Sequence, residues 1–369
     1  MKRERIHSAG PSITPLEIAT VTDAVTTGFY SNYRNYLEKF QNEFAKYVGV
    51  KYAIATSSAT TAMHLMAATA GLGPGDEVIV PDLSWIATAS VHTYTGAKPV
   101  FVDVDPDTWT MDPARLKAAI TPRTKAVMPV DLYGHPVDYD AIVPICREHG
   151  LIIISDSAPA VGALLHGKST ATYGDMAAYS FQGAKMMITG EGGMFVTDSE
   201  EHFKRAEFLV DDGRDESGGN TFWIKEIGFH YRMSNLTAAL GYAQLQRVEE
   251  LVAMKRQLFD WYHARLGQIP GISMFKERPD RRANCSYPSI LLQGRFKVDR
   301  DGLRAELKKR SIDTRPIFPK MSQFPMFETV DNPVAERIAA TGINLPTAAY
   351  LDEEDVDYIS KTIIEILGV

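Results

Sequence analysis

The chain of 369 residues lacks several features that mark particular classes of protein. It has only two cysteines, Cys146 and Cys285, without CxxC spacing, which excludes a disulfide framework. No apolar run is long enough to span a membrane, and the first residues lack the apolar core of a signal peptide. The 39 Lys and Arg are outnumbered by 46 Asp and Glu, giving a formal charge of −7 that disfavours nucleic acid as a partner. We therefore expect a cytoplasmic protein with neither a membrane nor a nucleic-acid partner.

The sequence also lacks a motif for a nucleoside triphosphate, a dinucleotide or zinc in the context that each requires. GALLHGKS at 162–169 fits the phosphate-loop pattern, but polar turn residues follow within six positions and leave no room for the necessary helix. GLGPGD at 71–76 follows a predicted helix and precedes a strand, the reverse of the dinucleotide-binding order. The nine His include no HExxH pair. We expect a hairpin or turn at 162–169, a turn at 71–76 and no metal site.

Short runs of branched apolar residues alternate with longer amphipathic stretches from residue 52 to about 210. Because these runs show no polar alternation, both faces of the sheet should be covered, as in parallel α/β proteins. We expect strands at 52–56, 77–81, 99–104, 126–132, 151–156, 177–181 and 193–198, with helices beginning near Thr60, Trp85, Asp112 and Asp138. One long helix should follow the N-cap Ser234 and reach Leu266.

The last third of the chain has the pattern of a smaller α+β unit. It contains a predicted strand at 286–292, a helix at 299–310, an extended segment at 313–318 and a final helix at 352–367. We therefore divide the chain into a large domain, residues 1–250, and a small C-terminal domain, residues 251–369.

Three polar features coincide with predicted strand ends. Asp156 ends a central strand, at the edge where open α/β sheets bind ligands. Lys185 follows another strand by a few residues and has the apolar neighbours Ala184, Met186 and Met187, which favour a neutral, nucleophilic amine. The segment 55–65 leads from a strand through small hydroxylated residues into a helix, whose free amides can bind phosphate.

A phosphate site, a buried acid and a desolvated lysine are what pyridoxal 5′-phosphate requires. Lysine forms the Schiff base, the acid keeps the pyridine nitrogen protonated, and the helix N-terminus holds the phosphate. Trp85, after the second strand, could stack on the ring or could equally be a core residue. Taken alone, Asp156 could be a helix cap and Lys185 a surface charge, so their combination carries the hypothesis.

Several long motifs occur in an order that resembles the DegT/DnrJ/EryC1/StrS sugar aminotransferases, within the fold-type I enzymes. They are GPGDEVIVP at 73–81, TPRTKAVMPVDLYGHP at 121–136, SF(x)3K at 180–185, TGEGGM(x)VTD at 189–198, FHYRMSNLTAALGYAQL at 229–245 and NLP at 344–346. The resemblance covers nearly the whole chain. It implies a mostly parallel seven-stranded sheet in the large domain, and it is strongest to members that aminate a nucleotide-linked 4-keto-6-deoxy sugar.

Residue by residue, the resemblance implies a complete cofactor site. Lys185 would form the Schiff base and move the proton, and Asp156 would bind the pyridine nitrogen. Trp85 would stack on the ring, and the phosphate would be held by Ser58, Ala59, Thr60 and Ser180. The resemblance further implies a homodimer with shared active sites, in which Arg232 reaches the neighbour's cofactor phosphate, and a substrate pocket that includes Trp223, Arg315 and Asn344. The chain departs from the family pattern at Pro159, where the family usually has Glu or Gln.

The expected activity is a ping-pong transamination from an amino acid, by resemblance L-glutamate, to the keto sugar. A sugar dehydratase on the same scaffold is one alternative, although the dehydrating relatives characteristically have His in place of the lysine found here at 185. A non-catalytic regulator with the same fold is another, and it would have no need of Lys185 or Asp156. An interaction scaffold has no positive feature in the sequence.

Overall fold

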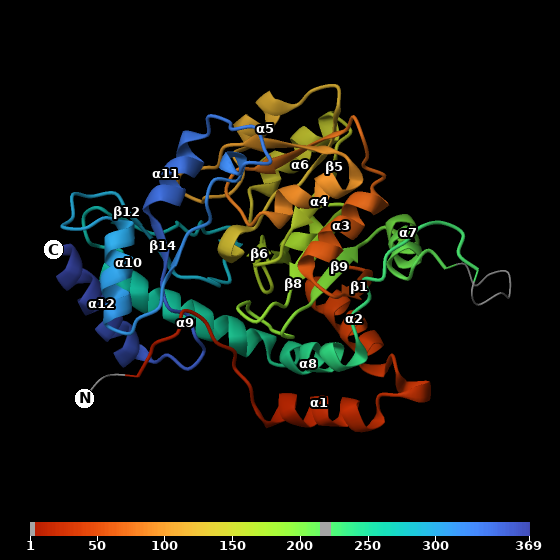
Figure 1. Cartoon of the computed structure of the whole chain (residues 1–369), viewed down its shortest axis with the longest axis horizontal. Helices are drawn as coiled ribbons and strands as arrows, with labels where there is room; N and C mark the ends of the chain where they lie inside the picture. Colours follow the sequence, from red (N-terminus) through yellow and green to blue (C-terminus); the bar gives the residue numbers. More distant parts are fainter. Residues whose placement is uncertain (1–3, 215–222) are drawn as a thin grey trace.

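The alternating pattern folds into one central sheet in the computed structural model, which describes residues 4–214 and 223–369 (Figure 1). The sheet has the order β1-β9-β8-β5-β4-β2-β3. Its strands are β1 (Tyr52–Thr56), β2 (Glu77–Pro81), β3 (Lys98–Val102), β4 (Thr124–Val127), β5 (Ile152–Asp156), β8 (Met176–Ser180) and β9 (Gly193–Thr197). Only β9 among these runs against the others, so the prediction of a mostly parallel seven-stranded sheet is confirmed.

Helices cover both faces of this sheet, as the uninterrupted apolar strands predict. In β2, for example, Val78 and Val80 pack into one core layer while Ile79 packs into the layer behind the sheet. The helices that pack on the Val78 face are α3 (Ala59–Thr69), α4 (Ala87–Thr95) and α7 (Glu200–Val210). The helices that cover the opposite face are α2 (Asn35–Val48), α5 (Pro113–Ala119), α6 (Tyr139–Glu148) and α8 (Asn235–Leu245). Helix α1 (Pro15–Thr27) lies along α8 at the lower edge of Figure 1.

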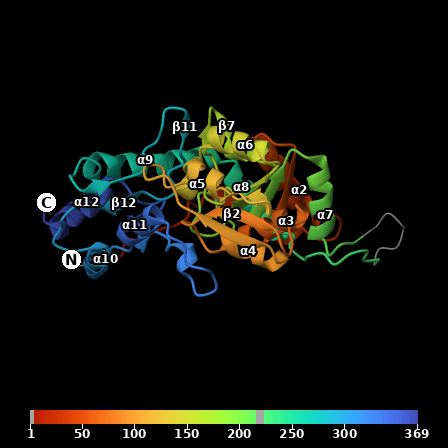
Figure 2. The same cartoon turned by 90° about the horizontal axis from the view of Figure 1, so that it is seen from above.

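The C-terminal third forms a separate antiparallel sheet, which lies at one end of the molecule in Figure 2. Its order is β10-β12-β14-β13, with β10 (Ile272–Ser273), β12 (Ser289–Leu292), β13 (Arg315–Pro316) and β14 (Gly342–Asn344) packed with α10 (Arg300–Lys309), α11 (Pro333–Thr341) and α12 (Glu353–Leu367). Helix α9 (Val248–Leu266) joins the two parts, because Leu251 packs into the large core and Leu258 into the small one. The boundary between residues 250 and 251 stays a prediction.

The single helix expected after Ser234 is wrong in one respect, because the chain breaks it into α8 and α9 at Gln246 and Arg247. Arg247 leaves helical geometry, with φ −114° and ψ 11°. Its guanidinium group instead binds Glu17 of α1 at 2.8 Å and Glu250 at 2.7 Å. The contact with Glu17 is tertiary, so the apolar periodicity of the sequence could not show the break.

The segment 162–169 forms the predicted hairpin, with β6 (Leu164–Leu165) antiparallel to β7 (Lys168–Ser169) and β11 (Arg281–Arg282) added beside β6. The segment 71–76 forms the predicted turn between α3 and β2. The described residues also include short 3-10 helices, η1 (Tyr30–Asn32), η2 (Leu132–Gly134), η3 (Thr170–Thr172) and η4 (Met321–Gln323). Within the part of the chain that is described, no helix has the length and apolar character to cross a membrane.

Candidate active site

A cavity of about 480 Å³ opens where the parallel strands of the large sheet end and the small domain meets them. Residues that follow β1, β2, β4, β5 and β8 line its floor, and residues of β13 and β14 close one side. This is the position at which open α/β sheets bind ligands. The cavity contains most of the site residues predicted from the sequence: Ser58, Ala59, Thr60, Trp85, Asp156, Ser180, Lys185, Arg315 and Asn344.

Asp156 lies at the carboxyl end of β5, between β4 and β8 in the sheet. Its carboxylate is buried, accepting a hydrogen bond from the Thr88 hydroxyl at 2.7 Å and one from the Ala158 N–H at 3.1 Å. Burial raises the pKa of Asp156, while the Thr88 hydrogen bond and the Lys185 charge act in the opposite direction. A buried carboxylate with two donors can hold a cationic ring nitrogen at this edge of the sheet.

Lys185 lies in the loop between β8 and β9 and lines the cavity together with its neighbour Ala184. The loop is held by hydrogen bonds from the Gly183 N–H to the Gly190 carbonyl at 3.0 Å and from the Lys185 N–H to the Gln182 carbonyl at 2.8 Å. Met186 and Met187 are buried in the large core, which leaves the lysine amine to face the cavity. Burial lowers the pKa of Lys185, and the Asp156 carboxylate partly opposes this effect. A lowered pKa increases the share of the neutral amine, which is the form of lysine that can act as a nucleophile or a base.

The phosphate turn, defined here as residues 57–60, connects β1 to α3. Ser58 is the N-cap, and its hydroxyl accepts the Thr61 N–H at 3.1 Å. Among the described residues, no acceptor binds the N–H groups of Ala59 and Thr60, the first two residues of the helix. Free amides at a helix N-terminus, where the helix dipole is positive, form an anion site. The sequence prediction for this turn differs from the structure only in placing the helix start one residue late.

The sheet register brings the phosphate turn beside the lysine loop. Gly193 of β9 lies opposite Thr56 of β1 on one side and opposite Ser180 of β8 on the other. A side-chain Cβ at position 193 would lie 2.4 Å from the Ser58 carbonyl carbon, so only glycine permits this approach. Gly193, the last glycine of the TGEGGM motif, therefore allows the phosphate turn to lie close to β9.

The groups in this cavity fit pyridoxal 5′-phosphate. Ala59 and Thr60 could donate to its phosphate, the Lys185 amine could bind its aldehyde carbon, and the Asp156 carboxylate could hold its ring nitrogen. The unpaired helix amides favour an anion and so suit the phosphate of the cofactor. The buried carboxylate favours a cation and so suits its protonated ring nitrogen.

The remaining predicted residues differ in their placement. Trp85 and Arg315 are exposed into the cavity, and Asn344 is buried at its wall with its amide donating to the Tyr133 hydroxyl at 3.1 Å. Trp223 and Arg232 do not line the cavity of their own chain. The Arg232 guanidinium lies 3.9 Å from Asp211, and its Nε has no hydrogen-bond partner among the described residues.

Several lining residues were missed from the sequence. Ser84 lines the cavity and is hydrogen-bonded at 2.8 Å to Thr88 of α4, which lies behind the cavity wall and supports Asp156. Others come from distant segments: Tyr133, Gln182, Glu191, Tyr287 and Phe318. Position after a strand end could have indicated Ser84 and Tyr133, but no local pattern indicates Tyr287 or Phe318, which come from the small domain. The unusual Pro159 also lines the cavity, and its carbonyl accepts hydrogen bonds from Asn284 and Ser286.

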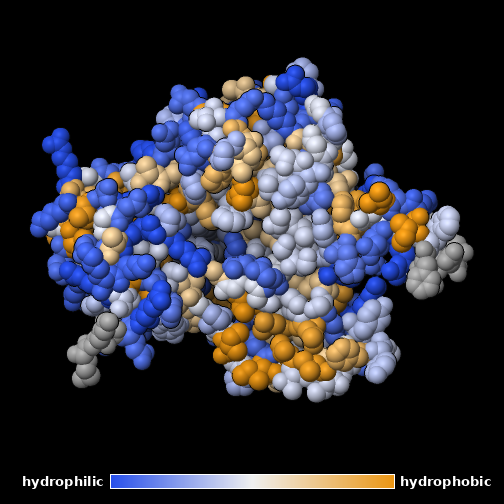
Figure 3. All heavy atoms as spheres, viewed as in Figure 1, coloured by the Kyte–Doolittle hydropathy of each residue, from blue (hydrophilic) through white to orange (hydrophobic). Residues whose placement is uncertain are grey.

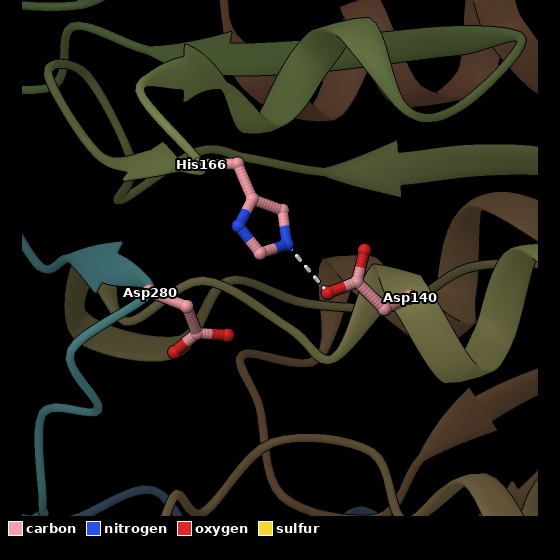
Figure 4. Close-up of side chains that lie close together, drawn as sticks. All are labelled: Asp140, His166 and Asp280. Carbon is pink, nitrogen blue, oxygen red and sulfur yellow. Dashed lines mark hydrogen bonds and ion pairs between the residues drawn. The ribbon is translucent and has the colours of Figure 1, made fainter.

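One group of three possible metal ligands occurs in the described part of the chain, and none of its members lines the cavity (Figure 4). His166 and Asp140 are exposed and form an ion pair at 2.7 Å. The third member, Asp280, binds the guanidinium group of Arg281 at 2.8 Å. Two separate ion pairs, His166 with Asp140 and Asp280 with Arg281, therefore account for the charged groups of this cluster.

Comparison with known proteins agrees with this geometry. Residues 11–364 match the family described as DegT/DnrJ/EryC1/StrS aminotransferase. The chain is 39% identical over 372 residues to the GDP-perosamine synthase of Caulobacter vibrioides, covering 98% of each. Among solved structures, Spr1654 of Streptococcus pneumoniae in its PMP form superposes with a TM-score of 0.93 at 26% identity, covering 99% of this chain and 98% of that one. DesV of S. venezuelae superposes with a TM-score of 0.89 at 29% identity, covering 98% of each.

The family match extends over almost the entire chain, and the superpositions include both the large sheet and the small domain. The cofactor expected from the cavity is also the one on which these enzymes depend. The chain therefore belongs to the DegT/DnrJ/EryC1/StrS family of pyridoxal 5′-phosphate-dependent sugar aminotransferases.

Proposed function

We propose that this protein transfers an amino group from L-glutamate to a nucleotide-linked 4-keto-6-deoxy sugar. The observation that carries the proposal is the convergence of Lys185 and Asp156 on one cavity with the free amides of the phosphate turn. The similarity to GDP-perosamine synthase supports the nucleotide-sugar class of the acceptor.

Bound pyridoxal 5′-phosphate would supply an electron sink for the carbanion that forms when the donor's α-proton leaves. In our proposal Lys185 Nζ takes that proton and returns it on the cofactor side, as a general base and then a general acid. Asp156 keeps the ring nitrogen protonated, and Ala59 and Thr60 fix the phosphate. Trp85 lies beside the cavity floor, where its exposed indole can cover one face of the ring.

Borohydride reduction followed by peptide mapping tests the role of Lys185. We expect the label on the peptide that contains Lys185 and no label there in Lys185→Ala. Prior incubation with L-glutamate should abolish labelling of the wild type, because the cofactor then leaves the lysine as pyridoxamine phosphate. Lys309→Ala, at an exposed lysine outside the cavity, serves as the control. A label on another lysine would refute the site.

The substrate is tested with amine-labelled L-glutamate and a panel of keto sugar nucleotides, reading label transfer by mass spectrometry. We expect transfer to a 4-keto sugar nucleotide and none in Asp156→Asn. Loss of water from the sugar without transfer of nitrogen would instead indicate the dehydratase. No reaction with any amino donor would indicate the regulator.

The proposal includes a homodimer with shared active sites, and two features support it. Large apolar side chains are exposed on and around α1, including Ile18 at 61% and Val25 at 51%, and Figure 3 shows hydrophobic residues gathered over this helix. Exposed apolar patches of this kind mark protein interfaces. In addition, Arg232 is largely buried yet its Nε has no partner within the described chain, as expected of a residue that binds across an interface.

Mixing two inactive variants tests the shared site. If Arg232 acts on the neighbouring subunit, hybrids of Lys185→Ala and Arg232→Ala chains contain one intact site, and random mixing should restore about a quarter of wild-type activity. If Arg232 acts within its own chain, every site in the hybrid is defective and no activity returns. Sedimentation at several concentrations would establish the dimer separately.

A further inference from the structure

A second cavity, of about 340 Å³, adjoins the active-site cavity and shares Arg315 with it. We call it the basic cleft and define it by Arg5, Arg304, Lys308 and Arg315, with Asp313 as the only carboxylate in its lining. The chain as a whole carries a formal charge of −7, so four cations around one small cavity are a local exception. Such a cleft attracts and concentrates anions.

Three segments that are distant in sequence build the basic cleft. Arg304 and Lys308 are one helical turn apart on α10, and each directly follows a buried leucine, Leu303 or Leu307. Arg315 begins β13. The N-terminal segment that carries Arg5 is held against the segment before β13, because the Ile6 N–H donates to the Ser311 carbonyl at 2.9 Å and the Asp313 N–H donates to the Ile6 carbonyl at 2.9 Å.

The positive charge of the basic cleft is only partly neutralised within the chain. Arg5 is paired with Asp313 at 2.8 Å, and Arg304 has one contact to Asp301 at 3.3 Å. The Arg304 Nε is buried without a hydrogen-bond partner in the described ranges. Across residues 4–214 and 223–369, no carboxylate forms an ion pair with Lys308 or Arg315. Lys308 and Arg315 are exposed as well as unpaired, so their charges are available to an anion that enters the cleft.

We propose that the basic cleft binds the phosphates of the nucleotide-linked substrate, with the sugar in the active-site cavity and Arg315 between the two. This inference rests on the proposed function, since it assigns a location to one part of that substrate. Guanidinium groups bind phosphate oxygens through paired hydrogen bonds, whereas a lysine contributes a point charge. An amino acid donor has no phosphate, so the basic cleft would distinguish the two substrates of one active site.

Titration of the holoenzyme with GDP and with dTDP tests the inference, using calorimetry and guanosine as the comparator without phosphate. We expect Lys308→Ala and Arg304→Gln each to raise the Kd for both nucleotides about tenfold or more, as for a lost hydrogen bond to a charged group. Lys309→Ala is the matched control, because Lys309 is on the same helix, lies outside the cleft and pairs with Glu306 at 2.6 Å. The wild-type Kd should also rise with salt.

Three results would overturn the inference: equal nucleotide affinity in all variants, no binding of either nucleotide, or guanosine binding as tightly as GDP. The conversion of wild-type cofactor to its amine form by L-glutamate is measured in parallel and tests the proposed function alone. If only the inference about the basic cleft is wrong, L-glutamate still converts the cofactor. If the proposed function is wrong, L-glutamate does not convert the cofactor even in the wild type.

Discussion

Replacing Thr88 by valine should impair the enzyme most strongly at low pH. The Thr88 hydroxyl donates its one proton to Asp156 at 2.7 Å, so the Ser84 hydroxyl, 2.8 Å away, must donate to Thr88. All three side chains are buried. Valine has nearly the same shape as threonine but no hydroxyl, so the substitution removes the hydrogen bond to the carboxylate and leaves the local packing almost unchanged.

The magnitude follows from the charge of the acceptor. A hydrogen bond to an ionised group contributes about 1.5–3 kcal/mol, which corresponds to about a tenfold to hundredfold change in the ionisation equilibrium. The donor stabilises the carboxylate form, so its loss raises the pKa of Asp156 further above its ordinary value, in the direction that burial already favours. Asp156 would then be protonated over a wider acidic range and could not hold a protonated ring nitrogen there.

The assay is the rate of the glutamate half-reaction as a function of pH. In Thr88→Val the acid limb should move to higher pH, with a rate loss of about tenfold or more on that limb and recovery toward the wild-type rate at alkaline pH. Thr88→Ser should restore the wild-type profile because it keeps the donor. Ser84→Ala should have a smaller effect because Thr88 can still donate. A loss of equal size at every pH, or an identical shift in Thr88→Ser, would show that the hydrogen bond is not the cause.

Two further predictions concern the phosphate turn and the small domain. Gly193→Ala should weaken cofactor binding by about tenfold or more, since the new Cβ would lie 2.4 Å from Ser58 backbone atoms. Gly183→Ala is the control, because its Cβ would meet nothing closer than 3.7 Å. Equal cofactor Kd values for the two variants would contradict the prediction. Lys255 is buried on α9, where it donates to the Thr347 carbonyl, and burial lowers its pKa to about 8. Because the unfolded chain binds this proton up to about pH 10.4, wild-type stability should rise between pH 8 and pH 10.4 relative to Lys255→Met, by up to about 3 kcal/mol. Urea unfolding at both ends of that range measures the difference, and a gap between the proteins that does not change with pH would contradict it.

The sequence by itself was sufficient for the groups whose positions follow from local structure. The strands ending at Thr56, Pro81 and Asp156 were located correctly, because uninterrupted apolar runs between turns have few alternative structures. In a parallel sheet the carboxyl ends of such strands meet at one edge, so Asp156 and the phosphate turn were expected to lie together before any contact was known. The apolar neighbours of Lys185 likewise indicated a desolvated amine.

Only the tertiary structure decided which distant groups complete and tune that site. Thr88 supports Asp156 from helix α4, Tyr287 donates to the Ala184 carbonyl at 2.8 Å from the small domain, and Arg247 interrupts a helix to reach Glu17. The basic cleft likewise joins α10, β13 and the N-terminal segment. The physical reason is the range of the interactions. Apolar periodicity and capping act between neighbours in the chain, whereas desolvation and hydrogen bonding depend on whatever the fold brings within a few ångströms.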